Sequence, residues 1–271
     1  MLRFAIFTVI VLVLLKAAVT WFEPAMVFYP SRGESDTPDD FGIRYEALKL
    51  RASDGVQLAA WQLEPEAPKA DIVYFHGNAG NLSLWLPVLA TLHSFGYRVL
   101  AVDYRGYGVS EGSPSERGLT LDAEAVVRHV AATRNGGGGS PARPLVYWGR
   151  SLGGPVAAVA AKSVPPDGLV LESTFPDKAS VVRSMPIFRL LNVFSSYRFD
   201  TAAPLRGFRN TVLVVHGDAD TIIPFELGRE LFEKLDAPKR FVTLRGADHN
   251  DVFDARREAY WAPIRAFIDA L

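Results

Sequence analysis

Residues 145–158 read Leu-Val-Tyr-Trp-Gly-Arg-Ser-Leu-Gly-Gly-Pro-Val-Ala-Ala. The first four are apolar and predict a short buried strand, and the small residues from Gly153 onward predict a helix packed closely against it. Ser151 lies in the turn between them, within the pattern Gly-x-Ser-x-Gly. A strand, a sharp turn and a helix in this order are typical of a nucleophile elbow, which exposes a serine hydroxyl at the end of a strand. Ser151 is therefore the candidate nucleophile of an α/β fold.

The same five-residue pattern occurs a second time, at Gly108–Gly112, with Ser110 at its centre. No apolar run leads directly into this copy, and Gly-Ser-Pro follows Ser110 closely, which is typical of a loop. Because the pattern alone is short enough to occur by chance, the strand and helix around it decide between the two copies. We expect catalysis at Ser151 and not at Ser110.

A serine hydroxyl needs a base to remove its proton and, in most cases, a carboxylate to orient that base. His249 is the best candidate base, because it lies in a polar segment between the last predicted strand and the last predicted helix. Asp220 follows the preceding apolar run and is the candidate acid, with Asp218 as a competitor that would also suit a turn. Structural positions are expected for the other histidines, which are His76, His93, His129 and His216.

Short apolar runs recur along the chain, at Ile72–Phe75, Val99–Val102, Leu145–Trp148, Leu169–Leu171, Val212–Val215 and Phe241–Leu244. Helical candidates lie between most of them, at Leu84–Ser94, Arg117–Thr133, Leu152–Ser163, Phe225–Leu235 and Asp254–Ala270. Apolar strands that alternate with helices predict a mostly parallel central sheet with helices on both faces. Ahead of them, Tyr45–Leu50 and Val56–Leu63 flank a Ser-Asp-Gly turn and predict a β-hairpin.

Residues 173–210 form a long connection between two predicted strands. The connection is rich in apolar residues, and we interpret it as a short lid insertion over a pocket. Phe188, Leu191 and Phe194 could line an acyl site there, or they could pack among themselves.

The N-terminal residues Phe4–Phe22 are apolar apart from Lys16, and 19 residues of helix reach roughly 28 Å, close to the thickness of a bilayer's hydrocarbon core. No small-residue pattern suited to cleavage precedes Trp21, so residues 1–25 predict a single-pass anchor, with a signal peptide or a buried helix of the domain as alternatives. Interfacial aromatic residues are expected at Trp21, Phe22, Phe28 and Tyr29. The sequence does not indicate which side of the membrane the domain at 26–271 faces.

The chain has 271 residues, with 29 Lys and Arg against 30 Asp and Glu, a formal net charge of −1 and no cysteine. Without a basic cluster, nucleic acid is not an expected partner. Without cysteine, the chain has no disulfide, no thiolate metal site and no cysteine nucleophile. The candidate chemistry requires neither a metal nor an organic cofactor, and no feature indicates an oligomeric state.

Several motifs in this order resemble the α/β-hydrolase superfamily, and more narrowly its membrane-anchored branch of serine-aminopeptidase-like hydrolases and ABHD-type depalmitoylases. They are His76–Asn81, Asp103–Gly108, the Ser151 segment, Leu171–Ser173, His216–Asp220 with Pro224, and Asp248–Asp251. The resemblance covers residues 26–271 and implies an α/β-hydrolase fold, in which the order Ser151, Asp220, His249 is the expected one. It also implies that the backbone N–H groups of Asn78 and Leu152 form the oxyanion hole.

The resemblance further implies that Asp103 and Arg105 are framework residues of their turn. One position departs from the family pattern, because Asp248 stands where the family usually has glycine, directly before His249. A second carboxylate beside the candidate base leaves the shape of its loop and its protonation open.

These residues predict the transfer of an acyl group from an ester or thioester to water. The anchor suggests a small-molecule or acyl substrate near the membrane, such as a lipid or an acylated protein. The alternatives are amide hydrolysis by an aminopeptidase, in which Glu172 would bind the substrate amine, a membrane-tethered binding protein without catalysis, and an acyltransferase. Serine at position 151 argues against the dehalogenase and epoxide hydrolase chemistry of members with aspartate there.

Overall fold

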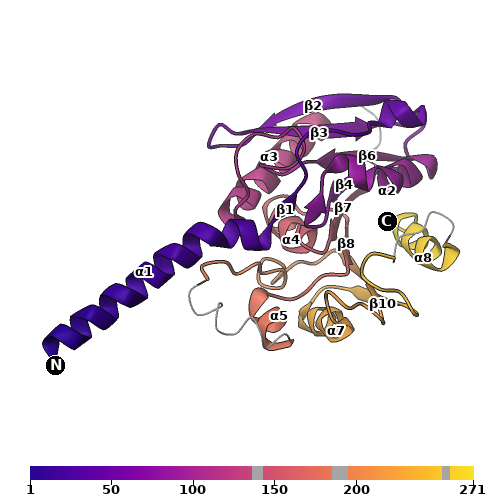
Figure 1. Cartoon of the computed structure of the whole chain (residues 1–271). Coiled ribbons are helices and arrows are strands. Elements are labelled where there is room, and N and C mark those ends of the chain that lie inside the picture. The colour runs from indigo at the N-terminus through magenta and orange to yellow at the C-terminus, as the bar shows by residue number, and fades with distance from the viewer. Residues whose placement is uncertain (136–142, 185–194, 252–256) are drawn as a thin grey trace.

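A computed structural model of the chain describes residues 1–135, 143–184, 195–251 and 257–271. An eight-stranded sheet runs through the centre of the domain (Figure 1). Its spatial order is β10 (Lys239–Leu244), β9 (Thr211–Gly217), β8 (Gly168–Glu172), β7 (Leu145–Arg150), β4 (Ala70–Phe75), β6 (Tyr97–Val102), β3 (Gln57–Leu63) and β2 (Tyr45–Arg51). Among these described strands, β3 alone runs in the opposite direction to the others, so the mostly parallel sheet and the β2–β3 hairpin predicted from the sequence are confirmed.

Helices cover both faces of the sheet (Figure 1). Residues of α2 (Leu82–Ser94) and α8 (Glu258–Ile268) are buried in the hydrophobic core on one face, and those of α3 (Glu116–Asn135), α4 (Gly153–Ser163) and α7 (Phe225–Lys234) in the core on the other. Successive side chains of a strand point to opposite faces, so Leu145 and Tyr147 of β7 join one core, whereas Val146 and Trp148 join the other. Because both faces of the strand are covered, the side chains on both faces are apolar, and the strand appears in the sequence as a continuous apolar run.

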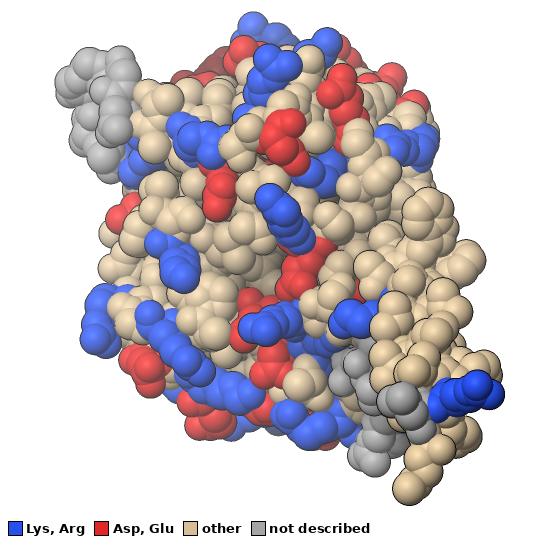
Figure 2. All heavy atoms as spheres, turned by 90° about the vertical axis from the view of Figure 1, so that its left-hand side faces the viewer, with Lys and Arg blue, Asp and Glu red and all other residues tan. Residues whose placement is uncertain are grey.

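Helix α1 (Leu2–Val27) projects away from the domain (Figure 1). Its apolar span, Arg3–Val27, is long enough to cross a membrane, and the most apolar stretch of that span is not buried, with Phe4 77% exposed. The alternative of a buried domain helix is therefore wrong. Figure 2 views the molecule from this side, where a large uncharged area occupies the lower right and charges of both signs are spread over the rest. The expected group of interfacial aromatic residues needs one correction, because Phe28 is 3% exposed and lies in the core, while Tyr29 is 61% exposed.

Four short elements were not expected from the sequence. The helix η1 spans Pro38–Phe41, the strand β1 (Tyr29–Pro30) pairs in parallel with β5 (Ala79–Gly80), and α5 (Lys178–Ser184) follows β8. The expected lid at 173–210 therefore includes α5, but Phe188, Leu191 and Phe194 lie outside the described residues, as does the start of the last predicted helix at Asp254.

Candidate active site

Ser151 directly follows β7, in the middle of the parallel part of the sheet. Its backbone has a φ of 51°, in the left-handed region that strains any residue with a side chain. The neighbouring strand restrains it, since the N–H of Ser151 donates to the carbonyl oxygen of Glu172 at 2.9 Å and the Thr174 hydroxyl donates to the carbonyl oxygen of Ser151 at 2.8 Å. The structure thus places Ser151 in a sharp, strained turn between β7 and α4, as the sequence predicted.

Two glycines make this turn possible. A Cβ at Gly153 would lie 2.0 Å from the carbonyl oxygen of Phe75, and a Cβ at Gly149 would lie 2.4 Å from the carbonyl oxygen of Gly153. Real Cβ contacts are essentially never shorter than 3.0 Å. Only glycine at both positions lets α4 start directly against the strands.

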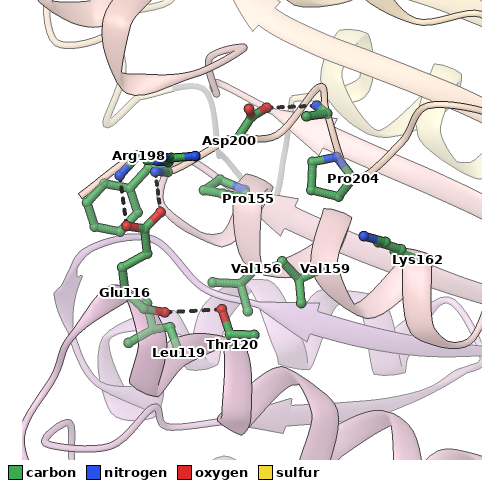
Figure 3. Close-up of a pocket in the computed structure, with 12 residues that line it drawn as sticks. Glu116, Leu119, Thr120, Pro155, Val156, Val159, Lys162, Arg198, Asp200 and Pro204 are labelled. Carbon is green, nitrogen blue, oxygen red and sulfur yellow. Dashed lines mark hydrogen bonds between the residues drawn. The ribbon is translucent and has the colours of Figure 1, made fainter. Parts of the chain in front are cut away.

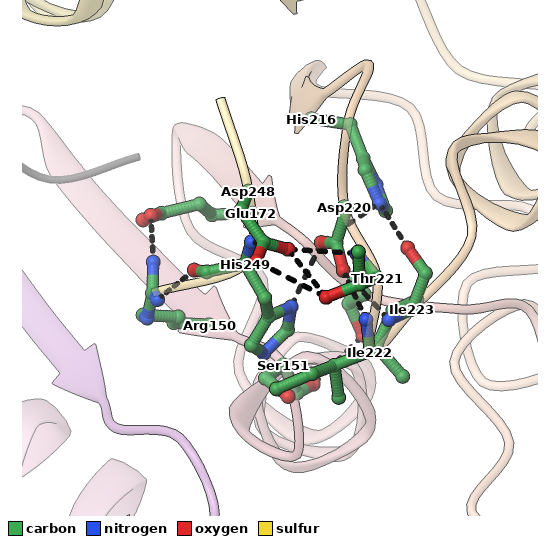
Figure 4. Close-up of polar contacts among 11 residues, drawn as sticks. Arg150, Ser151, Glu172, His216, Asp220, Thr221, Ile222, Ile223, Asp248 and His249 are labelled. Carbon is green, nitrogen blue, oxygen red and sulfur yellow. Dashed lines mark hydrogen bonds and ion pairs between the residues drawn. The ribbon is translucent and has the colours of Figure 1, made fainter. Parts of the chain in front are cut away.

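Asp220 and His249 come together from the loops that follow β9 and β10. The Nδ1 atom of His249 lies 2.8 Å from Oδ2 of Asp220, while Oδ1 of Asp220 accepts the N–H groups of Ile222 at 3.0 Å and Ile223 at 2.7 Å. Figure 4 shows the imidazole of His249 between Asp220 and Ser151, directed toward the serine. The three residues singled out in the sequence therefore meet at the carboxyl ends of the parallel strands.

A second histidine, His216, also contacts Asp220. Its Nε2 atom lies 2.8 Å from the carbonyl oxygen of Ile223, so it must carry a proton, and the same atom lies 3.3 Å from Oδ2 of Asp220. Burial raises the pKa of Asp220, but the hydrogen bonds from His216 and His249 outweigh it and hold this pKa well below its usual value. An ionised Asp220 places the proton of His249 on Nδ1 and leaves Nε2 as the acceptor.

Asp248 does not point at the imidazole of its neighbour. Its Oδ1 atom accepts hydrogen bonds from the N–H of Thr221 at 2.7 Å, from the Thr221 hydroxyl at 2.8 Å and from the N–H of His249 at 2.7 Å. These bonds, that of the Thr221 N–H first, hold the pKa of the Asp248 carboxyl below its usual value. The residue that departs from the family pattern therefore ties the histidine loop to the loop that carries Asp220 (Figure 4).

Asp218, the competing candidate acid, lies elsewhere. Its carboxylate accepts the N–H of Gly246 at 2.6 Å, and so joins two loops rather than contacting His249. Between the two candidates, Asp220 is the one bound to the histidine.

Arg150 is a contributor that the sequence analysis missed. Its side chain is 3% exposed, forms an ion pair with Glu172 and donates from Nη2 to the carbonyl oxygen of His249 at 2.6 Å. Glu172 is fully buried and also accepts from Trp148 at 2.8 Å and from the Tyr260 hydroxyl at 3.0 Å. Glu172 is therefore enclosed by protein partners, and the role considered for it, binding the amine of a peptide substrate, is not compatible with this geometry.

The two expected oxyanion donors lie on opposite sides of Ser151 in the sequence. Leu152 is the residue at the start of α4, where backbone N–H groups have no helical partner. Asn78 follows β4, and its side chain is fixed because Nδ2 donates to the carbonyl oxygen of Val27 at 2.6 Å and Oδ1 accepts from the Tyr107 hydroxyl at 2.9 Å. Within the described ranges of the chain, neither backbone N–H donates to another protein group.

The remaining motif residues hold the backbone of neighbouring turns and helices. Ser110 is 2% exposed, donates to the carbonyl oxygen of Asp103 at 2.6 Å and accepts from the N–H of Ala59 at 2.8 Å. Asp103 accepts the N–H of Leu82 at the start of α2, and Arg105 forms ion pairs with Asp54 and Asp122. Their expected roles in holding the turn agree with these contacts.

Two cavities lie near this part of the fold. One, of about 300 Å³, is lined by α3, α4 and residues 198–204, and Glu116 at its edge accepts the N–H of Arg198 at 2.7 Å (Figure 3). None of Ser151, Asp220 and His249 lines it. The other, of about 250 Å³, lies at the base of α1 and is lined by Val27, Phe175 and apolar residues of α5. Among the residues that the structure describes, no group of three or more His, Cys, Asp or Glu side chains could hold a metal ion.

The chain is similar to several known proteins. A family model described as serine aminopeptidase, S33, matches residues 66–204. An uncharacterised membrane protein of Saccharomyces cerevisiae is 33% identical over 96% of this chain and 93% of its own length. The lysophosphatidylserine lipase ABHD12 of Danio rerio is 32% identical over 72% of this chain and 60% of its own length. An esterase of Pyrococcus furiosus shares the fold, with a TM-score of 0.71 and 20% identity over 90% of this chain and 97% of that chain.

Proposed function

Because the chain belongs to the α/β-hydrolase superfamily, within the serine aminopeptidase S33 family, we propose that it is a serine hydrolase that cleaves carboxylic esters or thioesters. The observation that carries the proposal is the His249–Asp220 hydrogen bond beside the strained turn that holds Ser151. In this superfamily fold, the three residues would form a catalytic triad.

In the proposed mechanism, the hydroxyl of Ser151 attacks the substrate carbonyl while Nε2 of His249 takes its proton. Ionised Asp220 holds the Nδ1–H of the imidazole and stabilises the imidazolium that forms. The backbone N–H groups of Asn78 and Leu152 donate to the tetrahedral oxyanion, where the loss of one donor typically costs about 10² to 10³ in rate. His249 then returns the proton to the leaving alcohol or thiol.

The acyl-enzyme that remains is an ester of Ser151. His249 removes a proton from water, the hydroxide equivalent attacks the ester carbonyl, and the same two N–H groups stabilise the second oxyanion. Collapse returns the proton to Ser151 and releases the carboxylic acid. All of these steps use side chains and backbone groups of the chain itself.

We further propose that α1 anchors the enzyme in a membrane and that its substrates are lipids or other acylated molecules located there. The helix has the length and composition of a membrane span, and a relative matched over nearly the whole chain is named a membrane protein. Contacts of Glu23 and Val27 with the domain favour an anchor over a cleaved signal sequence.

The test is the hydrolysis of p-nitrophenyl esters from acetate to palmitate by the detergent-solubilised full chain. Ser151→Ala should lose activity on every ester, whereas Ser110→Ala, the matched change in the second Gly-x-Ser-x-Gly copy, should retain turnover per folded molecule. Inactivity of the wild type on all esters, with activity on an acyl-CoA, would redirect the proposal to thioesters. Equal activity of wild type and Ser151→Ala would contradict it.

Amide hydrolysis has less support than ester hydrolysis. The only acidic residue considered for binding a substrate amine, Glu172, is already surrounded by Arg150, Trp148 and Tyr260. An aminoacyl p-nitroanilide, assayed beside the esters, measures this alternative directly.

A further inference from the structure

The cavity at the base of α1 is formed by the end of that helix and by residues 175–182 and 195–199, which are far from it in the sequence. Its exposed surface is almost entirely apolar and is formed by Val19 and Val27 of α1, by Phe175, Val181 and Val182, and by Tyr197 and Phe199, although Glu23, Lys178 and Ser195 also belong to the lining. Its volume of about 250 Å³ is open to the exterior, so the cavity is not a packing defect of the core.

The face that α1 turns toward this cavity follows from helical spacing. Val19, Glu23 and Val27 are four residues apart and lie on one side of the helix, where they are partly or fully buried. Trp21 and Phe22 point elsewhere and are 82% and 60% exposed. If α1 spans a bilayer, its outward faces contact acyl chains, and the cavity opens beside them.

The base of α1 is held firmly against the domain. Glu23 is 6% exposed. Its carboxylate accepts the N–H and hydroxyl of Ser196 at 3.2 Å each and is also hydrogen-bonded to Ser195, whose hydroxyl accepts from Lys178 at 2.7 Å. Directly after the helix, the ring of Phe28 packs edge-on against Tyr197, with 5.8 Å between centroids. These contacts fix the position of the domain relative to the helix.

Two hydrogen bonds connect the cavity with the candidate catalytic residues. Asn78, an expected oxyanion donor, holds the carbonyl oxygen of Val27, which lines the cavity. Thr174 holds the carbonyl oxygen of Ser151, and the next residue, Phe175, forms another part of the cavity wall. Residues of the cavity wall are therefore tied to the oxyanion loop and to the nucleophile, although Ser151, Asp220 and His249 do not themselves line the cavity.

We propose that this cavity binds the hydrocarbon chain of an ester or thioester that resides in the membrane, and receives that chain from the bilayer beside α1. This inference rests on the proposed serine hydrolase function. Pockets that enclose a whole drug-sized ligand measure roughly 300–1,000 Å³, so a cavity of this size takes part of one acyl chain and leaves a headgroup outside. Helix α1 is then a wall of the substrate site as well as an anchor.

The first test fills the cavity from α5. Val182→Trp in the detergent-solubilised full chain should lower kcat/KM for p-nitrophenyl palmitate by at least about tenfold and leave p-nitrophenyl butyrate unchanged, because a short chain does not reach that wall. Ala179→Trp, an exposed position on the same helix, is the matched control and should change neither ester. An equal loss on both esters with Val182→Trp, or no loss on palmitate, would overturn the assignment of the cavity.

The second test does not depend on turnover. Ser151→Ala is incubated with a diazirine-bearing palmitate in detergent, irradiated and mapped by peptide mass spectrometry. The label should fall on residues 19–27 and 175–182, and it should decrease in the variant that combines Ser151→Ala with Val182→Trp. Label confined to residues 4–18 of α1 would contradict the site. If the wild type hydrolyses no ester, the proposed function fails, while this labelling still decides where the chain binds.

Discussion

The Nη2 atom of Arg150 donates a 2.6 Å hydrogen bond to the carbonyl oxygen of His249, so the residue directly before the candidate nucleophile holds the loop of the candidate base. The same guanidinium pairs with Glu172 at the end of the neighbouring strand β8. One buried arginine thereby links the ends of two strands with the loop after β10. This arrangement holds His249 through its backbone carbonyl.

Removal of the Arg150 side chain is expected to destabilise the fold. Arg150→Met leaves the carboxylate of Glu172 buried without its cation, and breaking a buried pair in this way costs about 3–5 kcal/mol. Arg150→Met with Glu172→Gln should cost less, because no uncompensated charge remains. Urea denaturation of the solubilised chain measures both free energies of unfolding. A double variant that is no more stable than Arg150→Met would show that the ion pair does not have this role.

Asp220 should make the stability of the protein depend on pH. Its folded pKa is lowered from an ordinary value of 3.8, so the stability that it contributes is fully present above that value and is lost as the pH falls through the folded pKa. Asp220→Asn should therefore be less stable than the wild type at pH 7, by about 1–3 kcal/mol, and the difference should shrink below about pH 4. Thermal or urea unfolding across that range checks it, and a difference that grows in acid would contradict the ionised Asp220.

The Asp248–Thr221 contact should affect the rate of catalysis by positioning the loops, although neither side chain takes part in the reaction. Asp248→Gly, which restores the residue usual in the family, removes the tie between the two loops and should lower kcat with little change in KM, by up to about 10²-fold. Thr221→Val should have a smaller effect in the same direction, because it removes only the hydroxyl bond. If Asp248 and Thr221 act through their mutual contact, the double variant will be no slower than Asp248→Gly alone. Losses in kcat that add in the double variant would instead argue for separate roles of the two residues.

The sequence predicted the sheet and the main helices because their apolar spacing is strong. Continuous apolar runs such as Val212–Val215 are what a strand covered on both faces requires, and they appear as β9 and its neighbours. The short α5 was not predicted, since seven residues carry too little periodicity to stand out from a loop. The β1–β5 pair has only two residues in each strand and no detectable pattern.

The contact between Asp220 and His249 was predicted because parallel strands bring their carboxyl ends to one edge of the sheet. The contacts of Arg150, His216 and Glu23 were missed, because they depend on the directions of side chains in three dimensions. Arg150 looked like a variable position inside the serine pattern, and His216 looked like a residue that only supports a turn, although it also contacts Asp220. Glu23 could not be placed from the sequence, because an isolated charge near the end of an apolar helix gives no indication of its partners.

The proposed hydrolase activity depends most directly on Ser151 being an activated nucleophile. The decisive measurement treats the full chain with a fluorophosphonate and maps the adduct by mass spectrometry. We expect one adduct per molecule on Ser151, none in Ser151→Ala and an unchanged adduct in Ser110→Ala. A folded wild type that is not labelled, or one labelled equally after Ser151→Ala, would contradict the proposed serine hydrolase.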